Sequence, residues 1–300
     1  MDWTVKKISL YGAELLKSNS SGMVHSTYRN TINLAFGGGL LSLHPEGTPM
    51  SPIGLITNIP ANCFERFGIE KGARVTINQE ASVLDLADLE NPLLSYAQAA
   101  TTDLSLSGPL SEQKTLFLLR NLRNGILAWG KEGLCTVFLP SGQEPDITAA
   151  ALARITEAKR SLAAANWEDA ARSLCGLIGL GPGLTPSGDD FLCGVLAGAG
   201  LTGLKGHPFV QCLSGQIFDG LSRTNDISRA FLRCALEGQY AEVIQLFYTQ
   251  PVRVILSEIR RIGHTSGVDT LCGILYLFQI WKKLRGDFGI REQEASYFAL

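Results

Sequence analysis

An eight-residue pattern occurs twice in the second half of the chain, and each copy opens an apolar helical segment. The pattern Ser-Gly-x-Asp-x-Leu-Cys-Gly runs from Ser187 to Gly194 and returns from Ser266 to Gly273, 79 positions later, with six identities in eight positions. Glycine inside a helix costs about 1 kcal/mol relative to alanine. Both copies bear this cost at one position, four residues after an aspartate and on its side of the helix. We therefore expect the two helices to pack across these glycines and to bring both Ser-Gly-x-Asp starts to one site.

Each copy also allows a purely structural interpretation. Ser-x-x-Asp is close to a capping box, in which the serine caps the helix and the acid three residues later reaches back. An acid in the first turn also suits the helix dipole, and such a cap contributes roughly 1 kcal/mol without any function. Capping, however, leaves Asp189 unexplained and does not require the Gly-Pro-Gly sequence that precedes the first copy.

The densest glycine cluster of the chain leads into the first copy, as Gly179-Leu-Gly-Pro-Gly-Leu-Thr-Pro-Ser-Gly188. Glycine permits close approach of the backbone, and a loop of this kind before a helix exposes N–H groups that suit an anion. The spacing Gly183-x-x-x-x-Gly188 matches that of a P-loop, but Asp189 and Asp190 stand where Lys and Ser or Thr should follow. The sequence therefore excludes a P-loop NTPase.

Two helix starts with two acids predict a mixed site. Their N–H groups would hold phosphate or carboxylate oxygens, while Asp190 and Asp269 could bind an amide or amine, move a proton, or hold Mg²⁺ that bridges to phosphate. His264 is a candidate acid or base, although a lone histidine there is as readily a simple hydrogen-bonding group. Arg223 could bind a carboxylate, but a turn and helix cap is the favoured interpretation of its segment, Arg223-Thr-Asn-Asp-Ile-Ser228.

The composition excludes several classes of protein. With 26 Lys and Arg against 28 Asp and Glu, the net charge is -2. The chain therefore lacks the excess of positive charge that binding to nucleic acid or an anionic membrane needs. The apolar runs are too short to span a bilayer, and the first residues lack the apolar core of a signal peptide. The seven cysteines include no CxxC pair, and the four histidines include no pair at metal-ligand spacing. We therefore expect a cytoplasmic protein with reduced thiols.

The order of short and long apolar segments predicts an α+β fold. Residues 1–88 are expected to form a β-rich barrel or sandwich, because short strand-like stretches are separated by Gly, Pro and Asn. The expected strands are Thr31–Phe36, Leu40–Leu43, Ile53–Ile59, Arg74–Ile77 and Ser82–Leu86.

Residues 89–300 are expected to form a mainly α-helical domain that carries the glycine-rich site. Ser111 is a plausible cap for the first helix of this domain, and Leu134–Leu139 is the one further strand expected there. The expected helices are Ser111–Trp129, Ile147–Ala165, Glu168–Ile178, Gly188–Leu201, Phe209–Leu221, Ile227–Leu236, Tyr240–Phe247, Val252–Ile262 and Gly267–Leu284.

The polar residues in these segments resemble those of a bacterial family long described as a domain of unknown function. Its members include a subunit of the oxamate carbamoyltransferase encoded with allantoin-degradation genes. The resemblance spans most of the chain and depends on Gly179 to Gly194, on Thr224-x-x-x-Ser228 with Ala235 and Gly238, and on Gly263-His-Thr-Ser-Gly-Val-Asp269. Weaker similarity comes from Val24-His-Ser26 and Asn33.

This resemblance implies a subunit of a several-subunit enzyme that converts oxalurate and phosphate to oxamate and carbamoyl phosphate in purine catabolism. The acids would orient the carbamoyl group, and His264 or an acid would move the proton. The catalytic candidates are Asp189, Asp190, His264 and Asp269. The candidates for binding carbamoyl phosphate, phosphate or oxamate are Gly181, Gly183, Thr185, Ser187, Gly188, Thr224, Ser228, Thr265, Ser266 and Gly267.

Two other interpretations remain open at the level of sequence. One is a Mg²⁺-dependent enzyme of other specificity that handles phosphate, with Asp189, Asp190 and Asp269 holding the metal. The other is a non-catalytic subunit, in which the glycine-rich helix starts serve packing and the β domain binds partner subunits.

Overall fold

The computed structural model describes residues 3–64, 69–86, 93–129, 133–138 and 146–286. The chain divides into two compact units. One comprises residues 1–105 with 239–242, and the other comprises residues 106–238 with 243–300. The boundary expected at residues 88 and 89 lies outside the described residues.

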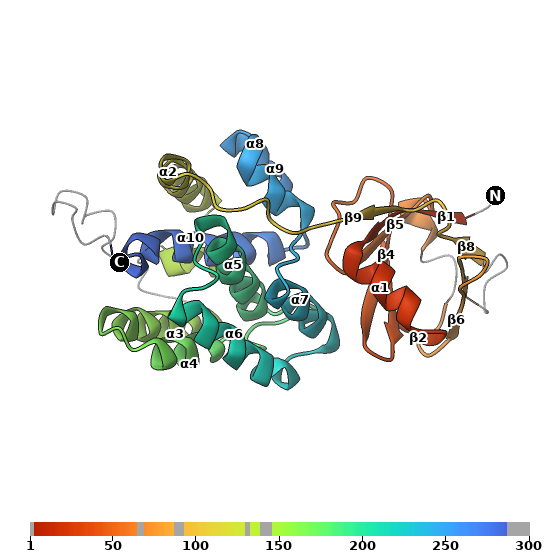
Figure 1. The fold of residues 1–300 in the computed structure, drawn as a ribbon, viewed down its shortest axis with the longest axis horizontal. Helices are drawn as coiled ribbons and strands as arrows, with labels where there is room; N and C mark the ends of the chain where they lie inside the picture. Colours follow the sequence, from red (N-terminus) through yellow and green to blue (C-terminus); the bar gives the residue numbers. More distant parts are fainter. Residues whose placement is uncertain (1–2, 65–68, 87–92, 130–132, 139–145, 287–300) are drawn as a thin grey trace. The chain divides into compact units, whose positions relative to one another are not determined.

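The first unit is a closed β-barrel of eight strands (Figure 1). Its strands follow the order β5-β4-β3-β2-β6-β7-β8-β1, and β1 pairs back to β5, which closes the barrel. A ninth strand, β9, pairs with the second half of β1. The strands are β1 (Trp3–Ser9), β2 (Ser21–Tyr28), β3 (Thr31–Phe36), β4 (Gly39–Pro45), β5 (Gly54–Thr57), β6 (Arg74–Asn78), β7 (Val83–Leu86), β8 (Leu93–Ser95) and β9 (Ala100–Thr102).

Alternate residues of the strands fill the barrel. Ile32 and Leu34 of β3 and Leu41 and Leu43 of β4 belong to one apolar core and are fully buried. Successive side chains of a strand point to opposite faces, so the residues between them lie on the outer face of the barrel. The helix α1 (Leu10–Ser18) connects β1 to β2, and Ser9 caps it by accepting the N–H of Gly12 at 3.0 Å.

The rest of the chain is almost wholly helical, so the expected β-rich barrel followed by a mainly helical region is confirmed. The long helices α5 and α10 lie in the middle of the second unit (Figure 1). Its elements are α2 (Glu112–Trp129), η3 (Gly133–Phe138), α3 (Asp146–Ala163), α4 (Trp167–Cys175), α5 (Ser187–Thr202), α6 (Pro208–Gly220), η4 (Leu221–Arg223), α7 (Asp226–Leu236), η5 (Glu242–Gln245), α8 (Leu246–Thr249), α9 (Val252–Ile259) and α10 (Ser266–Leu284).

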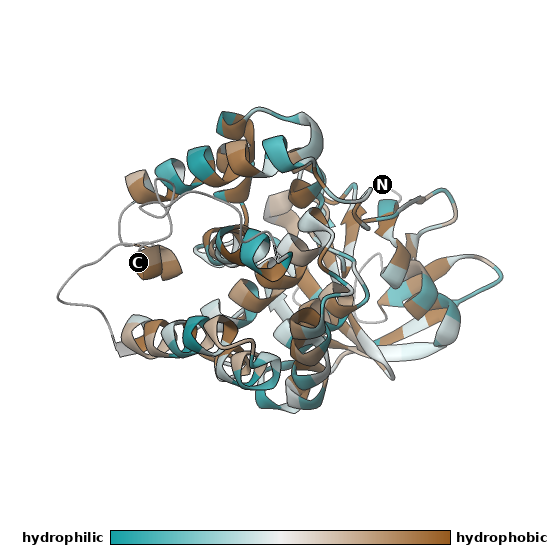
Figure 2. Ribbon diagram, turned by 60° about the vertical axis from the view of Figure 1, so that its left-hand side comes forward, coloured by the Kyte–Doolittle hydropathy of each residue, from teal (hydrophilic) through white to brown (hydrophobic). Residues whose placement is uncertain are grey.

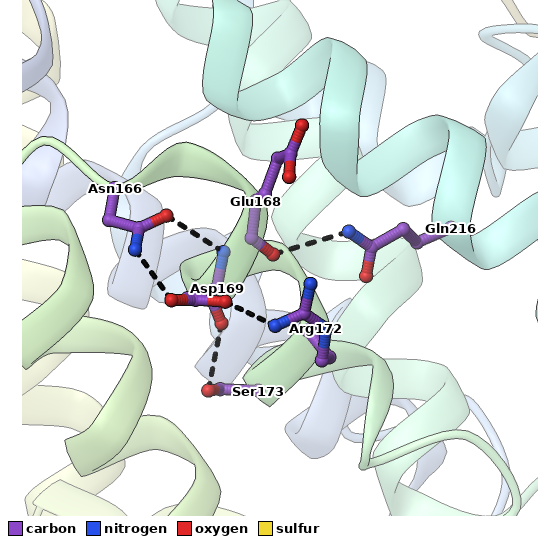
Figure 3. A network of polar contacts seen from close by, with 6 residues as sticks. All are labelled: Asn166, Glu168, Asp169, Arg172, Ser173 and Gln216. Carbon is purple, nitrogen blue, oxygen red and sulfur yellow. Dashed lines mark hydrogen bonds and ion pairs between the residues drawn. The ribbon is translucent and has the colours of Figure 1, made fainter.

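Caps at the helix starts explain several of these boundaries. The Ser111 hydroxyl accepts the N–H of Lys114 at 3.2 Å, so the expected cap of α2 is confirmed. Asn166 caps α4 by accepting the N–H of Asp169 at 3.2 Å (Figure 3). In the same network, Gln216 of α6 donates to the Glu168 carbonyl of α4 at 3.2 Å and joins the two helices.

Two expected elements differ in the structure. The expected strand Leu134–Leu139 is wrong, because Gly133–Phe138 is a buried 3₁₀ helix. A short apolar run cannot be assigned to strand or helix by periodicity alone. The expected helix Tyr240–Phe247 is divided between η5 and α8.

Hydrophobic residues dominate α5 and α10, whereas helices on the outside of the unit alternate between hydrophilic and hydrophobic segments (Figure 2). Among the described residues, no helix has both the length and the apolar character that a membrane crossing needs.

The packing of α5 on α10 depends on one glycine from each helix. A Cβ atom at Gly194 would lie 2.0 Å from the carbonyl oxygen of Thr270, and a Cβ at Gly273 would lie 2.0 Å from that of Phe191. Real Cβ atoms do not approach backbone oxygen this closely, so each helix fits against the other only where a side chain is missing. The expected packing across these two glycines is confirmed.

Substitution of either crossing glycine therefore tests this packing. Gly194→Ala or Gly273→Ala should destabilise the protein by about 1–3 kcal/mol or more, because the helices must separate to admit the methyl group. Chemical denaturation followed by circular dichroism measures the change. Gly215 in α6 is the matched control, since its added Cβ would meet nothing within 4 Å. Gly215→Ala should stabilise the protein by up to about 1 kcal/mol. Equal effects at the three positions would contradict the packing argument.

Candidate functional site

The crossing places the two Ser-Gly-x-Asp starts against each other in the interior. Asp190 is 7% exposed and Asp269 is completely buried. The pairing is reciprocal, because the Ser266 hydroxyl lowers the pKa of Asp190 and the Ser187 hydroxyl lowers the pKa of Asp269. Each acid therefore faces the serine of the other helix, and the charge of Asp269 also reaches Asp190.

The capping-box interpretation is wrong for both copies. The N-cap of α5 is Pro186 and that of α10 is Thr265, and neither makes a side-chain capping bond. Ser187 and Ser266 are instead the first helical residues. Their hydroxyls and the two carboxylates are therefore available for contacts between the helices.

Burial controls the protonation of the acid pair, Asp190 and Asp269. Loss of solvent raises the pKa of Asp190 well above its usual value, and the neighbouring negative charge of Asp269 raises it further. Burial also raises the pKa of Asp269 to about 6, although the Leu134 N–H, which donates to its Oδ1 at 2.6 Å, opposes this shift. Two like charges in a dry interior are costly, so the pair retains protons more readily than exposed aspartates do.

The second oxygen of each acid has no hydrogen-bond partner among the described residues. Oδ2 of Asp190 and Oδ2 of Asp269 are both buried and unpartnered, and so is the hydroxyl of Ser228 on α7. Buried polar atoms of this kind are rare, and a functional site is one accepted reason for them.

Asp189 has a different role from Asp190. Its Oδ1 accepts the N–H of Gly179 at 2.9 Å, and its Oδ2 accepts the hydroxyl of Thr224. Asp189 therefore ties the glycine loop to the segment that precedes α7. Burial raises its pKa, while Thr224, Gly179, Ser228 and Arg223 lower it.

The glycines after the two serines serve close packing. A Cβ at Gly188 would lie 2.0 Å from the Leu177 carbonyl oxygen, and one at Gly267 would lie 2.1 Å from that of Ile259. Their N–H groups donate to the carbonyls of Leu180 and Ile262, at 2.8 and 3.1 Å. These two amides, which the sequence suggested for an anion, thus donate to carbonyl groups of the chain itself.

The glycine loop turns on residues with positive φ. Gly181 and Gly183 have φ of 124° and 97°, a backbone conformation that residues other than glycine rarely adopt. Thr185, at the end of this loop, lowers the pKa of Asp190, and Thr265 does the same for Asp269. Both threonines therefore lie next to the acid pair.

His264 and Arg223 fall outside the acid pair. His264 is exposed in the turn before α10, whereas the acids are buried. Burial raises the pKa values of Asp189 and of the Cys175 thiol, and the charge of Arg223 lowers both. Sequence reasoning missed the contribution of Gly133, which has φ of 51° and would place a Cβ against Oδ1 of Asp269. Its only signal was a glycine before a short apolar run.

The Mg²⁺ interpretation would need Asp189, Asp190 and Asp269 to share one ion. The part of the chain that the structure describes contains no group of three or more His, Cys, Asp or Glu residues placed to hold a metal ion. Both oxygens of Asp189, the third acid expected for Mg²⁺, accept hydrogen bonds from protein groups.

The chain is thus a two-unit protein: one unit is a β-barrel, and the other carries a buried acid pair on two crossing helix starts. Comparison with protein families makes this more specific. A family model described as oxamate carbamoyltransferase subunit AllH matches residues 177–278, and a model described as the AllH family N-terminal domain matches residues 5–99. The two cover most of the chain, which therefore belongs to the AllH family. No solved structure matches the chain.

The raised pKa of Asp269 predicts how stability changes with pH. An acid whose pKa is higher in the folded state than in the unfolded state stabilises the fold most at low pH. That contribution decreases as pH rises above 3.8, the usual value, and is lost above about 6. At roughly 1.4 kcal/mol per pKa unit, the loss is on the order of 3 kcal/mol.

Asp269→Asn removes this titration but keeps an oxygen for the Leu134 N–H. Relative to the wild type, the variant should therefore gain stability between pH 4 and pH 7. Thermal unfolding at several pH values measures the difference. Asp219→Asn, at an exposed position of α6, is the control. Parallel pH curves for the wild type and Asp269→Asn would rule out the assigned shift.

Proposed function

We propose that the chain is the substrate-holding subunit of an oxamate carbamoyltransferase, which interconverts oxalurate and phosphate with oxamate and carbamoyl phosphate. The observation that carries this proposal is membership of the AllH family, because the match over residues 177–278 includes both Ser-Gly-x-Asp starts. The family description as a subunit leads us to infer that other chains complete the enzyme.

The proposed reaction needs groups that hold an amide and supply a proton. A phosphate oxygen attacks the carbamoyl carbon of oxalurate, the bond from that carbon to the oxamate nitrogen breaks, and the nitrogen takes up a proton. The buried acids suit both tasks. Their unpartnered Oδ2 atoms can accept the N–H bonds of a carbamoyl group, which is an uncharged donor.

A neutral carboxyl group in the same pair can supply the proton. Burial raises the pKa values of Asp190 and Asp269, so one of them carries a proton under conditions in which exposed aspartates are ionised. In this proposal the acid pair replaces His264 as the proton donor, because His264 is exposed while the acids are buried.

The glycine loop is the proposed entrance for the substrate. The two Oδ2 atoms are closed to solvent in this structure, so a substrate reaches them only when neighbouring chain moves. The residues of the loop between Gly179 and Pro186 include three glycines with positive φ. Glycine tolerates large changes of backbone conformation, and the loop N–H groups would then meet the anionic oxygens of the substrate.

The test is turnover by the complete enzyme, with this chain assembled with its partner subunits. Asp190→Asn and Asp269→Asn should each lower the rate of carbamoyl phosphate formation from oxalurate and phosphate by about 10²-fold or more. Asp219→Asn, in the exposed part of α6, should leave the rate unchanged. Wild-type rates in both acid variants would remove the acids from the mechanism and favour a scaffold role for the subunit.

The same assay addresses metal dependence. Turnover that persists in EDTA would argue against an enzyme in which Mg²⁺ holds the phosphate. Loss of turnover in EDTA, with recovery on adding Mg²⁺, would instead place a metal in the reaction. Either result leaves the effect of the acid substitutions interpretable, because each variant is compared with the wild type under the same condition.

A further inference from the structure

One position of the helix α5 is reached by solvent, although the helix lies in the interior of its unit. The structure describes all residues of α5 (Ser187–Thr202), and every one of them except Cys193 is buried. Cys193 is partly exposed, whereas its neighbours Leu192 and Gly194 are buried. Solvent therefore touches this helix at one position, about one turn after Asp190.

Exposure at this depth requires an open space inside the helical unit. Cys193 lies so far inside the unit that loss of solvent raises the pKa of its thiol well above the usual value. A residue at such a depth has accessible surface only where a cavity or crevice wide enough for a water molecule lies beside it. The accessible surface of Cys193 therefore marks such a space next to α5.

The space at Cys193 borders the two acids at the start of α5. Besides burial, the negative charges of Asp190 and Asp189 raise the pKa of the Cys193 thiol, so both carboxylates lie close to it. Asp190 precedes Cys193 by three residues and Asp189 precedes it by four, which places all three on one side of the helix. Asp190 Oδ2 is buried and has no hydrogen-bond partner among the described residues. A ligand in this space can therefore satisfy that oxygen with an N–H group.

The helix α7 lies on the same side of α5 as Cys193. It packs against α5, and its Cys234 also acts on the thiol of Cys193. Ser228 of α7 is 1% exposed, and its hydroxyl has no hydrogen-bond partner among the described residues. Gly194, in contrast, faces α10. The space therefore lies on the α7 side of the acid pair.

The groups around the space select an uncharged ligand. Asp189 and Asp190 repel a carboxylate or a phosphate when they are charged, and a thiol with a raised pKa stays neutral. We propose that the carbamoyl end of oxalurate occupies this space, where its NH₂ group donates to Oδ2 of Asp190 and its other side contacts the Cys193 side chain. This inference rests on the proposed function, and it adds Cys193 as a residue that limits the size of the group beside the acids.

Protection of Cys193 from a thiol reagent tests the proposal in the complete enzyme, on a preparation whose turnover of oxalurate has been measured. Methyl methanethiosulfonate is small and uncharged, and it transfers a methylthio group to a thiolate. Mass spectrometry of the digested protein follows each cysteine separately. We expect Cys193 to be modified slowly, because its raised pKa leaves little thiolate. The buried Cys234 should stay unmodified until the protein unfolds.

Oxalurate should protect Cys193 and leave Cys212 unaffected, since Cys212 is a partly exposed cysteine on α6. At ten times its Kd, oxalurate should slow the modification of Cys193 about tenfold. Phosphate alone should not slow it, because phosphate has no carbamoyl group, and protection by phosphate alone would assign the space to the anion instead. The inference is also overturned if Cys193 resists the reagent as Cys234 does, or if oxalurate leaves its rate unchanged in an enzyme that turns oxalurate over. In that last case the proposed function still stands.

A longer side chain at the same position tests direct contact with the substrate. Cys193→Met partly fills the space, so it should raise KM for oxalurate about tenfold or more while lowering kcat less. Cys212→Met is the matched control and should change neither constant. An unchanged KM in Cys193→Met would overturn the inference. If Cys193→Met fails to fold, the protection experiment on the wild-type enzyme decides alone.

Discussion

The contact between α5 and α10 at Gly194 and Gly273 is the constraint on which the helical unit depends. At each glycine, a backbone carbonyl oxygen of the other helix lies so close that an added Cβ atom would be only 2.0 Å from it. This approach brings the first turns of the two helices together, with both carboxylates between them. A larger residue at either position would move the helices apart and remove the reciprocal contacts of the serines and acids.

The acid pair is costly for the fold, and the surrounding residues reduce that cost only in part. Leu134 N–H, Thr185, Thr265 and the two serines all favour the charged forms, yet burial outweighs them and keeps the pKa values high. Asp189 shows the contrast, because two protein donors satisfy both of its oxygens. A fold that needed acids only for stability would satisfy all three in this way. Neighbouring residues 189 and 190 therefore differ, because both oxygens of Asp189 are satisfied while Oδ2 of Asp190 has no partner among the described residues.

The sequence predicted the fold class and the contact between the two repeated helix starts. The repeated Ser-Gly-x-Asp-x-Leu-Cys-Gly pattern located α5, α10 and their contact, because a glycine in an apolar helix has few explanations other than close packing. It could not separate Asp189 from Asp190, since that difference depends on Gly179 and Thr224, which the fold brings near. In the barrel, the expected strands located β3 to β7, but β1, α1, β2, β8 and β9 were missed. Their polar and apolar residues alternate weakly, and closure of the barrel, not local pattern, holds them.

The two units solve the problem of buried polarity in different ways. The helical unit buries two acids, and burial raises the pKa of both. The barrel buries an amide and a neutral hydroxyl, whose hydrogen bonds run along one row from Ser26 through Asn33 to Ser42. The polar groups of the barrel row satisfy one another, whereas each acid of the pair keeps one oxygen that has no partner among the described residues.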